Sequence, residues 1–211
     1  LYVGSKYYVE YYDATKFVEQ EKPLPHFSVV VAEPGAILVL KNGREFSVSQ
    51  KYKKDAVSNL TPFVVRNDTL YMLAGKLKIQ DKWFTVPEVY CKNVKSIIVR
   101  EKAIVTLDKF QANTLNITMN KSRLDWRFDS VSFVSIQAKD SDIYLNGKKL
   151  KNLAVKLDKT NITVYVTERI DKLLGSLKDG CLGNFAECNS IRLDADKTSD
   201  YSFVILGNHS N

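Results

Sequence analysis

The chain has 211 residues and a formal net charge of +7, from 31 basic and 24 acidic residues. Its apolar content of 45% and charged content of 26% are ordinary for a soluble globular protein. The lysine groups at 51–54 and 148–151 have acidic neighbours, so no concentrated basic face is expected and nucleic acid is not a predicted partner. No stretch approaches the ~18 apolar residues of a membrane span, so no transmembrane segment is predicted.

The first third of the chain predicts a strand-rich region. Residues 7–19 carry a spacing compatible with a helix, and they belong to a segment, 1–26, that is expected to form an N-terminal extension or cap. After it, β-branched and aromatic residues alternate with polar ones, which is typical of strands. These strands are expected at 27–31, 36–40 and 45–49.

Two turns punctuate this region. Asn42-Gly43 predicts a tight hairpin turn that pairs the strand before it with the strand after it. Asn67-Asp68 predicts another turn, around which residues 63–65 and 69–73 would pair. The N-terminal part, 27–88, is therefore expected to be antiparallel.

From about residue 89 the pattern becomes a repeat with a period near 19 residues. Apolar residues recur in two series, with steps of 19, 19, 19 and 20 in each. The first series is Ile98, Ile117, Ile136, Val155 and Gly175, and the second is Val105, Leu124, Ile143, Ile162 and Leu182. Flanking apolar positions repeat with the first series: Leu115 and Met119, Val134 and Ala138, Leu153 and Leu157, Leu173 and Leu177.

A fixed period with two short strands per unit predicts the coils of a β-solenoid. Equivalent strands would stack at ~4.8 Å and form ladders of inward-facing apolar side chains. An antiparallel sandwich is the alternative, although the loops of a sandwich vary more in length. Gly175 stands where a branched residue is expected and weakens the last coil, and residues 191–211 are expected to cap the stack. The predicted fold is all-β: one domain over 27–211, with solenoid coils over 89–190.

Two features resemble the autotransporter adhesin head domain, also called the GIN domain, of Bacteroidetes-type envelope proteins. The first is the run from Phe27 to Gly43 (Phe-Ser-Val-Val-Val-Ala-Glu-Pro-Gly-Ala-Ile-Leu-Val-Leu-Lys-Asn-Gly), followed by the strand-like Asn67-Asp-Thr-Leu-Tyr71. The second is the repeat itself, in coils such as 141–147 and 152–157. The resemblance covers about residues 27–204. It implies a short right-handed parallel β-helix in a secreted or membrane-anchored protein, and it brings no catalytic residues with it.

Catalytic and metal-binding patterns are sparse. His26 and His209 are the two histidines, and neither lies in a sequence pattern with a nucleophile. The three cysteines lack zinc-site spacing; Cys181 and Cys188 would either form a disulfide or remain buried thiols, with Cys91 unpaired. Acidic pairs occur at Asp140 and Asp142, Asp125 and Asp129, and Asp194 and Asp196, and we interpret them as solvated turn residues. We therefore expect no enzyme, no cofactor and no metal.

Exposed aromatic rings are the positive signal for binding. The candidate ligand-binding residues are Tyr7, Tyr8, Tyr11, Tyr12 and Trp83, since such rings stack on sugars and favour interfaces. The alternative is that they pack onto the solenoid as part of its cap. The leading hypothesis is an extracytoplasmic binding or scaffold module of the cell envelope that recognises a glycan or a cell-surface protein, with no signal or anchor visible in the sequence. A carbohydrate-active β-helix and a self-assembling structural spacer are the alternatives.

Overall fold

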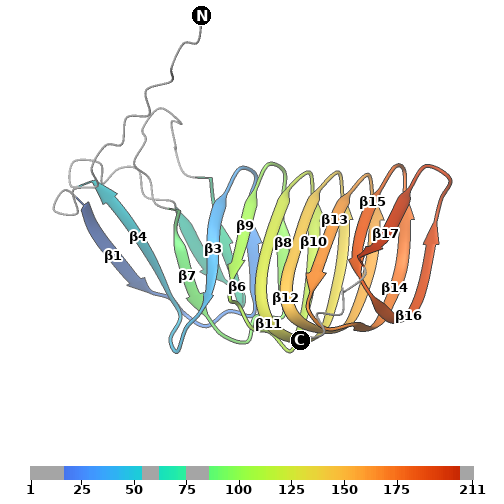
Figure 1. The fold of residues 1–211 in the computed structure, drawn as a ribbon. Coiled ribbons are helices and arrows are strands. Elements are labelled where there is room, and N and C mark those ends of the chain that lie inside the picture. Colours follow the sequence, from blue (N-terminus) through green and yellow to red (C-terminus); the bar gives the residue numbers. More distant parts are fainter. Residues whose placement is uncertain (1–16, 54–61, 75–85, 205–211) are drawn as a thin grey trace, which may run out of the picture.

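The computed structural model describes residues 17–53, 62–74 and 86–204, and every regular element in these ranges is a β-strand (Figure 1). The strands form one 17-stranded sheet wound into a solenoid, so the expected all-β solenoid fold is confirmed. No helix in these ranges has the length and hydrophobicity needed to cross a bilayer. The strands are β1 (Phe17–Pro23), β2 (Val29–Ala32), β3 (Ile37–Asn42), β4 (Ser47–Lys53), β5 (Phe63–Arg66), β6 (Thr69–Met72), β7 (Glu88–Cys91), β8 (Ser96–Val99), β9 (Ile104–Asp108), β10 (Thr114–Asn120), β11 (Arg123–Lys139), β12 (Asp142–Asp158), β13 (Asn161–Val166), β14 (Ile170–Lys178), β15 (Leu182–Ala186), β16 (Cys188–Ala195) and β17 (Asp200–Val204).

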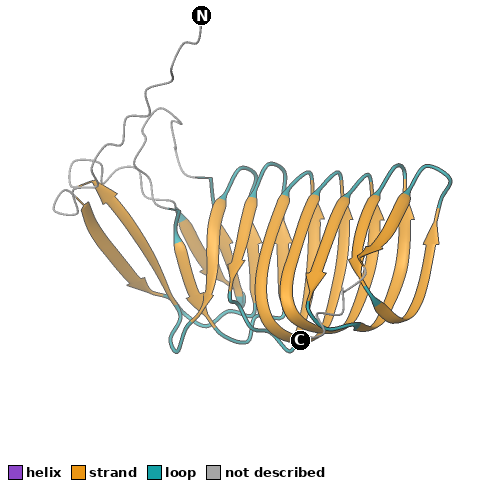
Figure 2. Ribbon diagram, in the orientation of Figure 1, coloured by secondary structure: helices purple, strands orange, loops and turns teal. Residues whose placement is uncertain are grey.

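The solenoid has two walls of parallel strands. In the first wall, β6, β2, β8, β10 and the C-terminal half of β11 stack in that order, followed by the C-terminal half of β12, then β14 and β16. In the second wall, β7, β3, β9 and the N-terminal half of β11 stack, followed by the N-terminal half of β12, then β13, β15 and β17. β11 and β12 run through a corner and contribute to both walls. Figure 2 shows the loops between coils in a row along one edge.

The coil order in space differs from the order in sequence. The coil made of β2 and β3 lies between the later coil of β6 and β7 and the still later coil of β8 and β9. Residues 86–91 therefore return to the outer side of the first coil before the regular repeat begins. This return brings corners that are far apart in the sequence next to one another, which matters for the site described below.

The N-terminal part, expected to be antiparallel, is only partly so: β2 and β3 pair parallel to their neighbours, β4 pairs antiparallel to its own, and the hairpin expected at Asn42-Gly43 does not form. β7 lies between β3 and β4, parallel to β3 and antiparallel to β4. β1 pairs antiparallel with the other side of β4. The chain passes over the end of β7, where the Gly43 amide donates to the Cys91 carbonyl and a Cβ on Gly43 would lie 2.8 Å from that of Tyr90. Glycine is needed here for close approach and not for a hairpin turn.

The other N-terminal predictions have mixed outcomes. The hairpin of β5 and β6 is confirmed, with Asn67 and Asp68 both at positive φ (49° and 57°), as a two-residue turn of type I′ requires. The helix expected over 7–19 is wrong at its end, because residues 17–19 belong to β1. The rest of that segment lies outside the described residues. The division of the chain at 26, 88 and 190 stays a prediction.

Apolar ladders fill the interior. Ile117, Ile136 and Val155 face one another on successive coils, and so do Val105, Leu124, Ile143 and Ile162, all at most 4% exposed. The flanking ladders are in register too: Leu115, Val134, Leu153 and Leu173 in one, Met119, Ala138, Leu157 and Leu177 in the other. Each such residue contributes roughly 1.5–3 kcal/mol by leaving water, which makes these ladders the main stabilising element of the coils.

The structure departs from the predicted ladders at both ends. Ile117 pairs with Ile97, not Ile98, which lies one position along and points outward, half-buried. Ile162 pairs with Gly183, while Leu182 points outward and is 52% exposed. The steps there are 20 and 21 residues instead of 19 and 20, and a shift by one residue in a strand reverses the face of the side chain.

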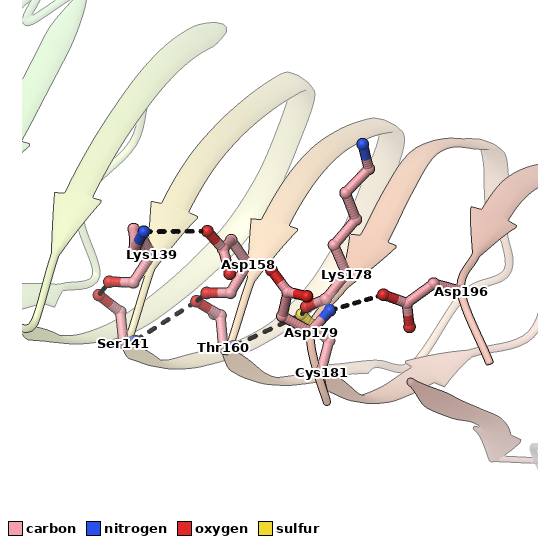
Figure 3. A network of polar contacts seen from close by, with 8 residues as sticks. All are labelled: Lys139, Ser141, Asp158, Thr160, Lys178, Asp179, Cys181 and Asp196. Carbon is pink, nitrogen blue, oxygen red and sulfur yellow. Dashed lines mark hydrogen bonds and ion pairs between the residues drawn. The ribbon is translucent and has the colours of Figure 1, made fainter. Parts of the chain in front are cut away.

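A row of small polar residues, the corner row, fastens one coil to the next (Figure 3). Its members are Ser122, Ser141, Thr160, Cys181 and Ser199. The backbone N–H of each of the first four members donates to the side-chain oxygen or sulfur of the next one, over 3.1–3.4 Å. All three cysteines are free thiols, and Cys181 occupies a hydroxyl position in this row. The row satisfies amides that the turns leave unpaired.

Candidate functional site

A groove of about 540 Å³ opens where the strands of the first wall begin. Four segments line it: 26–28 before β2, Asp68 before β6, 93–95 before β8, and 111–114, which leads into β10 and includes its first residue. Backbone bonds fix these segments to one another, because Ser28 N–H donates to the Asp68 carbonyl (3.0 Å) and Lys95 N–H to the Ser28 carbonyl (2.8 Å). The groove is therefore part of the stacked scaffold, and the backbone positions that carry its side chains are fixed relative to one another.

Asp68 is the electrostatic centre of the groove. Its Oδ1 lies 3.0 Å from Nδ1 of His26, and its Oδ2 accepts a hydrogen bond from the Ser28 hydroxyl. The Ser28 hydroxyl is the main influence, reinforced by His26, that holds the pKa of the Asp68 carboxyl below its ordinary value. An ionised carboxylate only accepts, so Nδ1 of His26 carries the proton and Nε2 is the atom left for a ligand.

The His26 ring is held on both sides. Its centroid lies 4.9 Å from that of Phe46, which in turn packs edge-on against the buried Phe27. With the Asp68 contact on its other side, the imidazole has a fixed orientation although its side chain is 64% exposed. An exposed pair of this kind adds little to folding stability. The effect of the His26–Asp68 contact is instead to orient the imidazole, so that its Nε2 faces a ligand in a defined direction.

The remaining lining supplies amides, a hydroxyl and an ammonium group over a small apolar floor. The polar lining residues are Asn93, Lys95, Gln111, Asn113 and Thr114. Asn42 fixes the Gln111 segment by accepting its backbone N–H (3.2 Å) and donating to the Lys109 carbonyl (2.9 Å). Val94, 3% exposed, forms part of the floor. The amides and the hydroxyl both donate and accept hydrogen bonds, as the hydroxyls of a sugar do, and the ammonium group of Lys95 donates.

An exposed aromatic ring lies next to the groove. Phe133 on β11 is the register partner of Thr114 on β10, so their side chains neighbour each other on the outer face of the first wall. Phe133 is 36% exposed, which is high for so large an apolar side chain in a regular strand. Cross-strand neighbours lie about 4.5–5.5 Å apart at Cβ. The ring is thus within reach of a ligand that extends out of the groove past Thr114.

The arrangement does not form an activated nucleophile. Ser28 and His26 both donate to Asp68, so the carboxylate stands between them and the Ser28 hydroxyl has no base. The sequence showed His26 in no pattern with a nucleophile, and the coil stacking brings His26 and Ser28 to Asp68 across about 40 residues of sequence. Because Asp68 lies between His26 and Ser28, the three residues form a hydrogen-bonding cluster and not a catalytic triad.

In each acidic pair seen in the sequence, at least one carboxylate interacts with another partner. Asp125 pairs with Arg123, Asp142 accepts from Asn161, and Asp129 lies 3.8 Å from Lys148. Asp196 caps a turn by accepting the Asp179 and Thr198 amides. Within the described part of the chain no group of His, Cys, Asp and Glu has the arrangement of a metal site.

The aromatic candidates from the sequence, Tyr7, Tyr8, Tyr11, Tyr12 and Trp83, lie outside the described residues, so their role stays a prediction. The groove was not predicted. Its components are ordinary turn residues in sequence, and only Asn67-Asp68 and the Pro-His-Phe entry to β2 carried any local signal. What joins them is the insertion of the first coil between two later ones.

Comparison with known proteins supports the fold. No family model matches the sequence, and no curated protein matches it. Among solved structures, a candidate adhesin from Bacteroides fragilis shares 12% identity, covering 90% of this chain and 97% of its own, with a TM-score of 0.65. The match to a candidate adhesin from Parabacteroides merdae has 11% identity and also covers 90% of this chain and 97% of the other. Its TM-score of 0.39 is too low to show a common fold. At such identities the first likeness shows a common fold.

Proposed function

We propose that the chain is a non-catalytic, extracytoplasmic binding module of adhesin type, which binds a glycan in the groove around Asp68. The observation that carries this proposal is the groove itself: amide, hydroxyl, imidazole and ammonium groups converge there from backbone segments that hydrogen bonds between stacked coils hold together. Ligand sites commonly combine such polar groups with an apolar or aromatic surface. Here Val94 and the nearby Phe133 provide that surface.

The comparison with known folds agrees with this proposal. The candidate adhesin from Bacteroides fragilis has the same fold over most of both chains. Membership of the autotransporter adhesin head family, and a place in the cell envelope, belong to the same proposal. The name of a protein with 12% identity suggests the kind of role, and the groove suggests the ligand.

The groove has too few carboxyl groups for glycan cleavage, which favours glycan binding. A glycosidase places two carboxyl groups on either side of the bond that it cleaves, about 5–9.5 Å apart. Among the described residues that line the groove, Asp68 is the one acid, and two donors already hold it. The groove therefore offers recognition without the acid and base that hydrolysis requires.

Glycan-array binding by the intact chain tests the proposal. We expect binding to a restricted set of glycans, weakened by Lys95→Ala and by Asn113→Ala about fivefold to tenfold each, the usual effect of losing one or two hydrogen bonds. Lys156→Ala and Asn146→Ala, which remove the same side chains from exposed strand positions elsewhere, serve as controls and should bind as the wild type does. Absence of glycan binding by the wild type, or equal losses in the controls, would overturn the proposal. Binding to cells that survives removal of their glycans would point to a protein ligand instead.

A further inference from the structure

The C-terminal end of the solenoid is an open sheet edge. β16 pairs with β14 and β17 pairs with β15, and within the described residues neither has a strand on its other side. Figure 1 shows β16 standing at the far end of the stack. An exposed edge offers a row of backbone donors and acceptors to another strand. The parallel coils end here without the antiparallel ribbon that β1 and β4 form at the other end.

No described residue covers the interior of the stack at this edge. Ile191 continues the ladder of Leu153 and Leu173, which are at most 1% exposed, yet Ile191 itself is 45% exposed. Tyr201 on β17 is 46% exposed in the same coil. Leu193 lies beside Ile191 on the inward side and is only partly buried. These side chains occupy inward-facing ladder positions, but no further described coil packs against them.

The sequence of β16 is complementary to itself in antiparallel orientation. Ile191, Leu193 and Ala195 point inward, since they pair with Leu173, Gly175 and Leu177. Arg192 and Asp194 point outward and are exposed. If two copies of β16 meet antiparallel about an axis through Leu193, Arg192 of each copy lies directly opposite Asp194 of the other. Directly opposite residues are about 4.5–5.5 Å apart at Cβ, within reach of an ion pair.

We propose that this end of the solenoid binds a second copy of the chain, by antiparallel pairing of β16 with β16 of the partner subunit about a twofold axis at Leu193. The pairing fills the open edge with backbone hydrogen bonds, places Ile191 opposite Ala195 and Leu193 opposite Leu193 of the other copy, and forms the Arg192–Asp194 pair twice. A twofold contact of this kind is closed, so assembly stops at a dimer. The proposal is independent of the glycan groove, which lies among the N-terminal coils.

Charge reversal at the edge tests this dimer by sedimentation velocity over a wide range of protein concentration. R192D alone places two acids opposite each other at both contacts, and D194R alone places two arginines opposite each other. Each single variant is expected to weaken dimerisation about a hundredfold or more. The double variant R192D/D194R restores opposite charges and should dimerise again. A mixture of the two single variants should form the mixed dimer although neither pairs with itself.

Controls separate pairing from folding. Both residues are exposed, so each variant should keep the wild-type melting temperature measured at a concentration where all are monomers. K156E, a charge reversal on an exposed strand position away from the edge, should dimerise as the wild type does. A wild type that stays monomeric would overturn the proposal, as would a dimer that ignores R192D and D194R, or single variants whose mixture fails to associate.

Discussion

Gly175 faces Val155 on the neighbouring coil so closely that a Cβ on the glycine would lie 1.8 Å from the Val155 carbonyl oxygen. The glycine has φ of 148°, a conformation that side chains disfavour. The expectation from sequence that a branched residue belongs at this position is therefore wrong. With this backbone conformation, a Cβ on Gly175 would point into the backbone of Val155, so only glycine fits.

Restoring the apparently missing side chain is expected to destabilise the protein. Gly175→Val should lower the free energy of unfolding by about 2–4 kcal/mol, since it combines overpacking with backbone strain. Urea denaturation measures the change. Ser176→Val, at the next and outward-facing position of β14, is the matched control and should stay close to wild type. A Gly175→Val variant as stable as wild type would show that the coils can separate locally at no cost.

The register of the first regular coil can be tested at adjacent isoleucines. Ile97 is fully buried opposite Ile117, whereas Ile98 is half-buried on the outer face. Ile97→Asp should unfold the domain, because a charge would enter the ladder without a partner. Ile98→Asp should cost only about 1 kcal/mol. Circular dichroism melts of the two variants give the comparison, and greater damage from Ile98→Asp would favour the register expected from the sequence.

This pair of residues also shows where sequence-based prediction stops. The 19-residue spacing identified the ladders from Ile117 to Val155 correctly. Each ladder needs one inward-facing residue from every coil, so its members recur at the length of a coil. Within Ser-Ile-Ile-Val both isoleucines satisfy the same pattern, and the 20-residue step was hidden. The same holds at Leu182, next to a glycine that occupies the inward position.

The groove could not be predicted from the sequence, for a different reason. Asp68 meets His26 and Ser28 because β2 is inserted between β6 and β8, and no repeat in the sequence marks that insertion. Each strand is short, with four residues, so several parallel partners would satisfy its alternation equally well. Pairing at this end depends on the whole stack, whereas the ladders depend on a local period.

The corner row predicts how Cys181 will tolerate substitution. Its sulfur accepts the Thr160 N–H (3.4 Å) and donates to the Lys178 carbonyl (3.0 Å), as the hydroxyls of Ser141 and Thr160 do in their own coils. Cys181→Ser should therefore keep wild-type stability, while Cys181→Val should lose about 1–3 kcal/mol because two buried backbone groups lose their partner. Thermal melts under reducing conditions compare the two. Equal stability of both variants would mean that the row contributes packing alone.

The turn held by Asp196 makes the last coil sensitive to acid. The Asp196 carboxylate accepts hydrogen bonds from the Asp179 amide (2.7 Å) and from the amide and hydroxyl of Thr198 (3.0 and 2.9 Å), and the Asp179 bond is the main cause that lowers its pKa from 3.8 to about 2. A carboxyl whose pKa is lower in the folded state stabilises folding above about pH 3.8, and this contribution is lost as the pH falls from there towards 2. Asp196→Asn should thus be less stable than wild type at pH 7, with the difference shrinking as the pH drops from 4 to 2. Urea midpoints measured along this pH series test it, with Asp200→Asn, an exposed acid outside this turn, as the control that should follow the wild-type slope. A difference between Asp196→Asn and wild type that stays constant down to pH 2 would mean that the charge on Asp196 does not stabilise the turn.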